Sequence, residues 1–335
     1  MRRLVVVSSM SSRGKTNIEE DTQSCVEQFF VYSWTLEECK EAVTQNEFFN
    51  NVKQNLDASA AQNVSTIPSD AVVSKFHFAG GSSRFMFGYC TSDVISLLDN
   101  SVTFVSEVLP YLKGKIVYCS ENVINRLFSC YKQNGNPKPA IVSNYAATLL
   151  AMKEGPGLIA NIASWISADR NPSMDGWLLE MWFFASLRKG GLKLYHRGNN
   201  NTEHWTESVV DTFDVSRVQS IPDDATWWKP IKWNQGGYDA IYTEKRSGTL
   251  RVVQVASGVT HSFKIEHFYQ VAGSISSFYP IQTFEIIFVV DNAHINDFQI
   301  RSVSGQGLLQ PFGWHKNKET NYVKVVGVDG WRTNT

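Results

Sequence analysis

An aspartate and a glutamine interrupt an otherwise apolar pattern in the stretch GGYDAIYTEKRSGTLRVVQVASG, residues 236–258. On both sides of the turn-like letters KRSG, the residues alternate as they do in a β-hairpin. With the turn at these letters, Asp239 faces Gln254 across the strands, and their Cβ atoms lie about 4.5–5.5 Å apart on one face. A loop one residue longer or shorter would shift this register.

Oxygen-bearing side chains are costly in an apolar sheet unless something binds them. Mg²⁺ prefers oxygen ligands and retains several waters, so Asp239 and Gln254 are candidate ligands of a divalent cation. In a second interpretation, the two side chains only hydrogen-bond each other or nearby backbone. The pair alone does not choose between the two.

A carboxylate also lies inside an apolar helical pattern. The stretch WLLEMWFFASL, residues 177–187, is apolar around most of its circumference and predicts a buried helix. A charged residue in such a helix needs a partner, and Glu180 is the one it contains. Either the helix directs Glu180 toward the hairpin as a third metal ligand, or Glu180 is exposed at the helix edge.

A lysine follows the hairpin closely. The stretch HSFKIEHFYQVAGSISSF, residues 261–278, has helical spacing. Lys264, near its start, could reach back to stabilise negative charge or position a water, or it is an ordinary solvated helix residue. His261 is expected to make a local contact at the start of the same helix.

Tryptophans cluster just before the hairpin, in TWWKPIKWNQ, residues 226–235. With Lys229 and Lys232, these rings could flank a nucleic-acid groove through base stacking and phosphate contacts. Burial in the core is the favoured interpretation. The tryptophans concerned are Trp227, Trp228 and Trp233.

The composition is that of a folded globular protein rather than a disordered chain. Of 335 residues, 43% are hydrophobic and 19% are charged, which suffices for two domains with cores of their own. The net charge is −1, so any binding of nucleic acid would depend on a local basic patch rather than on the charge of the whole protein. Five cysteines without a C-x-x-C pair argue against a disulfide framework or a structural zinc site. No apolar run approaches the ~20 residues that span a bilayer, so no membrane partner is expected.

The break ADRNPSMDG, residues 168–176, is the best domain boundary and predicts domains at 1–168 and 172–335. The first is expected to be mainly helical, and the second a compact α/β domain. In the first domain, the other expected features are a short strand at 1–7, a helix at 33–43 with Thr35 and Glu38 as a capping box, a helix end and polar loop within 51–74, a strand or loop, a Gly-Gly turn and an apolar helix start in 75–90, and helices over 93–168 with a break at 134–139. In the second, they are a strand at 190–197, a polar loop at 198–206 and a buried strand at 284–291.

A helix Glu, a strand Asp, a second-strand Glu or Gln and a nearby Lys form the constellation of the PD-(D/E)XK, or restriction-endonuclease-like, nucleases. The resemblance implies their fold, a central mixed sheet flanked by helices, for the second domain. The stretches around them resemble the C-terminal nuclease region of the Crinkler effectors of plant pathogens, with the retrotransposon hot spot proteins as more distant relatives. These stretches are GWLLEMWFFASLRKGGL, WWKPIKWNQGGYDAI and VQVASGVTHSFKIEHFY.

The N-terminal half resembles the sensor strand and helical lid of an AAA/STAND-type ATPase, in RLVVVSS, VYSWTLEECKEA and AGGSSRFMF. Arg84 matches the sensor arginine of the lid. The stretch SMSSRGKT, residues 9–16, is not a phosphate-binding loop, because the pattern requires glycine where Ser9 stands. The resemblance therefore implies an ATPase remnant without its nucleotide-gripping part.

The resemblance implies a DNase-like effector domain that uses Mg²⁺ or Mn²⁺ and acts on DNA, with RNA also open. Glu180, Asp239 and Gln254 would hold the metal, and Lys264 would supply the positive charge, because the usual lysine position of the second catalytic strand is Ala256. It further implies secretion and action in the host nucleus, promoting cell death or modulating immunity. The alternative is a catalytically degenerate nuclease fold that binds nucleic acid or host proteins.

Overall fold

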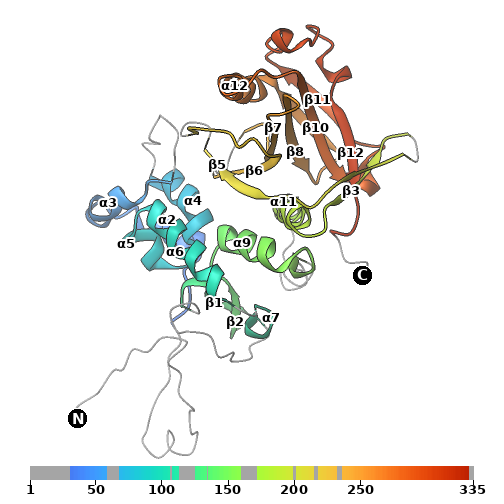
Figure 1. Ribbon diagram of the computed structural model, residues 1–335. Helices are drawn as coiled ribbons and strands as arrows, with labels where there is room; N and C mark the ends of the chain where they lie inside the picture. Colours follow the sequence, from blue (N-terminus) through green and yellow to red (C-terminus); the bar gives the residue numbers. More distant parts are fainter. Residues whose placement is uncertain are drawn as a thin grey trace, which may run out of the picture. The chain divides into compact units, whose positions relative to one another are not determined.

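The computed structural model describes residues 31–58, 68–105, 108–112, 125–133, 135–159, 172–198, 201–214, 218–231 and 236–331. The chain divides into two compact units, residues 1–150 and 151–335 (Figure 1). The division falls earlier than the predicted break at 168–176, whose first residues lie outside the described part of the chain. The predicted strand at 1–7 and the stretch 9–16 lie outside it as well.

The first unit is mainly helical, as expected. The predicted capping box is confirmed: the Glu38 backbone N–H donates to Thr35 Oγ1, and the Thr35 N–H donates to Glu38 Oε2. The elements are α2 (Leu36–Ala42), α3 (Asn46–Val52), η2 (Lys53–Asn55), α4 (Pro68–Ala79), α5 (Ser83–Gly88), α6 (Thr91–Phe104), α7 (Leu109–Leu112), β1 (Phe128–Gln133), β2 (Asn136–Ile141) and α9 (Asn144–Glu154), which crosses the boundary.

Two expectations for this unit are wrong. The stretch predicted as a strand or loop before the Gly-Gly turn belongs to α4, because its polar and apolar residues fit a helix that buries Val72 and Phe78. The helical pattern expected over 93–168 is wrong around its predicted break at 134–139: the break is confirmed, but the residues on both sides form an antiparallel hairpin in which β1 pairs with β2. Gly135, at a φ of 82°, supplies the left-handed residue of its tight turn.

The second unit is built on one mixed sheet with the strand order β4-β3-β12-β10-β8-β7-β6-β5. The strands are β3 (Leu192–His196), β4 (Thr202–Trp205), β5 (Val210–Phe213), β6 (Thr226–Pro230), β7 (Ala240–Glu244), β8 (Thr249–Ala256), β10 (Thr283–Asp291) and β12 (Lys324–Val328). The chain runs from α11 (Pro172–Arg188) through β6, β7 and β8, and α12 (Ile265–Ser276) then connects β8 to the parallel strand β10. A separate pair, β9 (Thr260–Lys264) and β11 (Gln299–Ser304), and the short turns η3 (Asn292–His294), η4 (Gln310–Phe312) and η5 (Glu319–Asn321) complete it.

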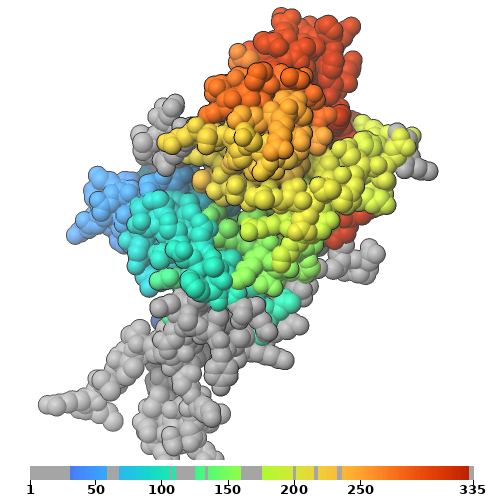
Figure 2. Space-filling view, viewed as in Figure 1, coloured from blue at the N-terminus to red at the C-terminus, as the bar shows by residue number. Residues whose placement is uncertain are grey.

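The sheet curls around α11. The ring of Trp205 on β4 lies 4.8 Å from the ring of Trp227 on β6, although these strands lie near opposite ends of the strand order. Phe183 of α11 contacts both rings edge-on, at 6.3 and 5.9 Å. Burial of these aromatic rings therefore holds the curl closed over one face of the sheet. The second unit, coloured from green-yellow to red, packs into one continuous body (Figure 2).

The opposite face of the sheet packs against α12. Its buried cluster contains Ile241 and Val252 from the hairpin, Phe288 from β10, and Phe268 and Ile275 from α12. The apolar residues of α11 are absent from this cluster, so the two helices cover different faces (Figure 1).

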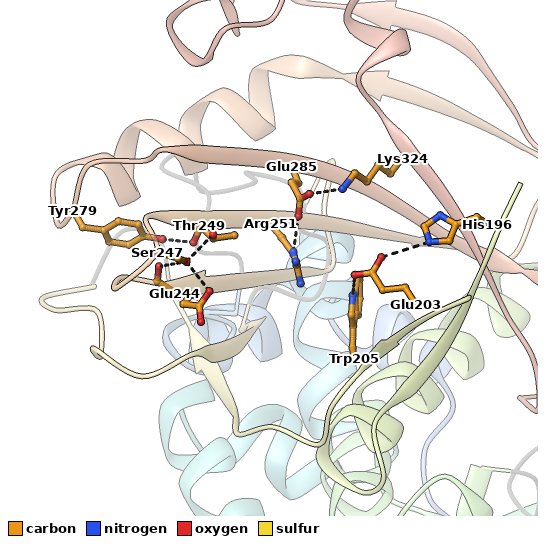
Figure 3. Close-up of polar contacts among 10 residues, drawn as sticks. All are labelled: His196, Glu203, Trp205, Glu244, Ser247, Thr249, Arg251, Tyr279, Glu285 and Lys324. Atoms are coloured by element: carbon orange, nitrogen blue, oxygen red, sulfur yellow. Dashed lines mark hydrogen bonds and ion pairs between the residues drawn. The ribbon is translucent and has the colours of Figure 1, made fainter. Parts of the chain in front are cut away.

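A polar network ties the strands together on the α11 side (Figure 3). Arg251 on β8 donates to Glu285 on β10 at 2.5 Å, and Lys324 on β12 pairs with the same carboxylate. The Arg251 guanidinium also lies over the rings of Trp205 and Tyr242, at 5.8 and 5.1 Å. Each charge of this network has a partner, which marks the cluster as structural.

Predicted elements of the second unit are partly confirmed. The strands expected at 190–197 and 284–291 are β3 and β10, and the buried helix at 177–187 is part of α11. The expectation of a polar loop over 198–206 is wrong at residues 202–205, which form the edge strand β4. The helix expected from 261 begins at Ile265, because residues 260–264 pair with β11.

Among the helices of the described residues, none combines the length and apolarity needed to cross a lipid bilayer.

Candidate active site at the end of the central sheet

The hairpin has the register that the sequence predicts. Glu244 pairs with Thr249 and Ala240 with Val253, so the next pair outward is Asp239 and Gln254. Gln254 Nε2 donates to Asp239 Oδ2 at 2.6 Å. The expected cross-strand contact is therefore confirmed, at the end of the sheet where β7 begins.

Asp239, just before the first residue of β7, extends the hydrogen bonding of the hairpin by one residue. Its backbone N–H donates to the Val253 carbonyl at 2.8 Å, and its Oδ2 accepts the Val255 N–H at 2.7 Å as well as the Gln254 amide. Both of these donors point at the same carboxyl oxygen. Gln254 uses its NH₂ group in this contact, which leaves its carbonyl oxygen as the atom suited to a cation.

The carboxyl of Asp239 is an unusual acid. Desolvation raises its pKa to about 8, and the negative charge of Glu180 contributes to the rise. The Val255 N–H, the charge of Lys229 and the Gln254 amide oppose it. The residue keeps some exposed surface, yet its carboxyl is withdrawn from water, so a proton or another positive charge is needed to neutralise it.

Glu180 has a partner that the sequence does not reveal. Its carboxylate forms an ion pair with the ammonium of Lys229 on β6. Lys229 is buried, with 9% of its surface exposed, and its ammonium lies 4.8 Å from the centre of the Phe184 ring. Glu180 is thus neither an isolated buried charge nor freely solvated at the helix edge.

The two polar pairs approach the end of the sheet from its two faces. Strand alternation places Asp239 and Gln254 on the side of Ile241 and Val252, which pack toward α12. Lys229 and Glu180 lie on the α11 side.

This donor set fits a divalent cation in its chemistry. Two carboxylates and an amide oxygen are the hard oxygen ligands that Mg²⁺ takes, and mutual repulsion of the carboxylates is what a cation relieves. The residues that the structure describes contain no group of three or more His, Cys, Asp or Glu side chains arranged to hold a metal. A cation here would thus rely on Asp239 and Gln254, with Glu180 joining if it leaves Lys229.

The remaining predicted residues lie elsewhere. Lys264 is an exposed residue at the end of β9, where it pairs with Ser304 of β11, and no hydrogen bond or ion pair joins it to Asp239, Gln254 or Glu180 in the described part of the chain. His261 is on β9 rather than at a helix start, and its ring packs edge-on against Phe288 at 5.5 Å.

The other side chains named from the sequence include three core residues, whereas Arg84 is exposed. Trp227 and Trp228 are buried, which confirms the favoured core interpretation, whereas Trp233 and Lys232 lie outside the described residues. Ala256 packs in the cluster under α12. Arg84 lies in α5, 5.4 Å from the Phe85 ring centre.

The loop that leads to Asp239 packs directly on α12. A Cβ atom at Gly236 would lie 2.7 Å from His267 Nε2, and one at Gly237 would lie 2.6 Å from His267 Cβ. Gly237 also has a φ of 84°, in the left-handed region. His267 was not predicted from the sequence, although the letters GG before the Asp are a signal of close backbone approach.

Replacing Gly237 with Ala is therefore expected to destabilise the second unit by about 1–3 kcal/mol, from backbone strain and the clash with His267. Chemical denaturation measures the change. Gly273 is the matched control, because it lies on the exposed side of α12 and a Cβ atom added there would meet no other atom within 4 Å. Gly273→Ala should be neutral or stabilising, by up to about 1 kcal/mol. Equal stability of the two variants would show that the loop accommodates a side chain.

No family model, no curated protein and no solved structure matches this chain. The geometry of the site is therefore the basis on which its function can be inferred.

Proposed function

We propose that the second unit is a metal-dependent nuclease domain that hydrolyses phosphodiester bonds of DNA. The observation that carries the proposal is the contact of Asp239 with Gln254 at the end of the sheet, beside the Glu180–Lys229 pair. An acid and an amide oxygen on one face of this end of the sheet, and a helix carboxylate on the other, are the residue types that the resemblance to PD-(D/E)XK nucleases implies. The mixed sheet with helices on both faces supports the same fold.

Asp239 and Gln254 would hold Mg²⁺ or Mn²⁺, with Glu180 as a direct or water-mediated third ligand. A bound divalent cation supplies Lewis acidity and lowers the pKa of a bound water. Asp239 must release its proton to take part, and Gln254 orients it through the hydrogen bond to Oδ2. An amide in place of a second carboxylate weakens cation affinity, so we expect a slow enzyme.

The resemblance also suggests where the protein acts. We propose that the protein is an effector delivered into host cells, with nuclear DNA as its substrate and cell death or altered immunity as its consequence. The first unit, under this proposal, is an ATPase lid remnant that serves as a packing or docking module.

A catalytically degenerate fold that binds nucleic acid or host proteins is the second candidate. Three observations favour it: Gln254 gives its NH₂ group to Asp239, Lys229 holds Glu180, and Ala256 stands where a lysine is usual. Such a cluster is electrostatically satisfied without a metal.

Plasmid DNA incubated with purified protein separates the candidates. Under the nuclease proposal, Mg²⁺ or Mn²⁺ supports nicking or degradation, EDTA stops it, and Asp239→Ala reduces the rate by at least about a hundredfold. Asp211→Ala, an exposed aspartate on β5, is the matched control and should cleave like wild type. Calorimetric titration with Mg²⁺ adds an activity-free readout.

Cleavage that persists in Asp239→Ala would point to a contaminating nuclease and against this site. Binding of DNA without cleavage, together with no heat on Mg²⁺ titration, would favour the degenerate fold.

A further inference from the structure

We infer that Lys229 is an internal counter-ion of this site, which competes with a divalent cation for Glu180 and gives the metal-loaded site its net positive charge. The inference rests on the proposed function and names a positioning residue for it.

The position of Lys229 is set by the fold rather than by a flexible surface chain. Strand β6 pairs with β7 on one side and with β5 on the other, where Thr212 lies opposite Lys229. Trp227, two residues earlier on the same face, is buried against Phe183 of α11. The strand therefore directs the Lys229 side chain inward, toward the helix that carries Glu180.

The surroundings of the ammonium explain why a lysine is kept there. The Phe184 ring lies 4.8 Å away, and Glu180 is its ion-pair partner. Burying one of these charges alone would be strongly unfavourable, so each depends on the other.

Counting charges shows what Lys229 adds. Glu180, ionised Asp239 and Lys229 sum to −1, and a divalent cation brings the cluster to +1. A phosphodiester, with its single negative charge, would then neutralise the site. Without Lys229 the loaded cluster would be neutral and would attract the substrate less.

A cation that recruited Glu180 would bind a carboxylate whose Oε1 is already paired with Lys229, so the ammonium would oppose cation binding. Lys264 lacks such a link, because it is exposed at the end of β9. Cation binding at Glu180 and the strength of its pair with Lys229 would therefore be coupled.

Two substitutions at this position test the competition in opposite directions. Lys229→Met removes the competitor, so calorimetry should show Mg²⁺ binding roughly tenfold tighter than wild type, while plasmid cleavage at saturating Mg²⁺ falls at least about tenfold. Lys229→Arg keeps the charge and can hold Glu180 in a bidentate pair, so Mg²⁺ binding should weaken. If Lys229→Met does not fold, Lys229→Arg still decides the question.

Equal Mg²⁺ affinity in wild type and in the folded variants would overturn the role of Lys229 and leave the nuclease proposal standing. No Mg²⁺ binding in wild type or in any variant would overturn both. Binding in Lys229→Met but not in wild type would support the competition and show that Lys229 keeps the native site closed to metal.

Discussion

Asp239→Asn is expected to become more stable than wild type as the pH rises from 5 to about 8.5, by roughly 2–4 kcal/mol over that interval. Burial raises the pKa of Asp239 to about 8, from an ordinary value of 3.8. Between these values the folded protein keeps a proton that the unfolded chain releases, so wild-type stability falls as the pH rises. Asparagine carries no charge at any pH, and its carbonyl oxygen can still accept from Gln254 and Val255.

Urea denaturation at several pH values measures this difference. Asp211→Asn, an exposed aspartate of the same unit, should show no such trend. The same proteins can be compared with and without Mg²⁺. If Asp239 binds the cation, Mg²⁺ should raise the wild-type melting temperature at pH 8.5 and leave that of Asp239→Asn unchanged. A stability difference that is flat across this pH range would mean that the carboxyl is ionised and well solvated in the folded protein.

The hairpin could be predicted in full because its information is local. A turn at KRSG fixes which residues face each other, and the period of two along a strand fixes which side they occupy. Asp239 and Gln254 follow from these rules without knowledge of any other element. The buried helix could be predicted for the same reason, because apolar residues surround Glu180 in the sequence itself.

The partner of Glu180 could not be predicted, because it depends on how the sheet curls. Lys229 reaches Glu180 only because β6 and α11 meet inside the curl, which brings Trp227 and Trp205 together from distant strands. No local pattern encodes that approach. The sequence shows only a lysine beside tryptophans, and a nucleic-acid contact explains such a pattern as well as an ion pair does.

Strand pairing also overrode a helical pattern. The stretch from His261 has helical spacing, yet its first residues form β9 because β11, about forty residues further on, offers a partner. Lys264 therefore ends a strand instead of occupying the first turn of a helix. Its assignment as the catalytic lysine rested on proximity in the sequence, and that proximity does not bring it to Asp239.

Burial of a lysine in the first unit could not be predicted either. Lys75 of α4 is fully buried, and its ammonium donates to the backbone carbonyls of Asn55 and Tyr89. These carbonyls lie at the ends of η2 and α5, where helices leave acceptors unpaired. Asp57 lies within electrostatic reach and favours the charged lysine, but desolvation prevails and lowers the pKa of Lys75 to about 8.

Lys75→Met is therefore expected to destabilise the protein by about 2–4 kcal/mol below pH 8, because two part-buried backbone carbonyl groups lose their donor. The deficit should widen as the pH rises from 8 to about 10.5: there the unfolded chain holds a proton on Lys75 that the folded protein has released, so the wild type gains stability with pH and methionine does not. Lys53→Met is the control: this exposed lysine of η2 contacts Asn50 of the preceding helix α3, and its replacement should change stability by less than about 0.5 kcal/mol. Denaturant unfolding of all three proteins across this pH range measures the result. A methionine variant as stable as the wild type would show that packing, not the ammonium, joins the ends of η2 and α5.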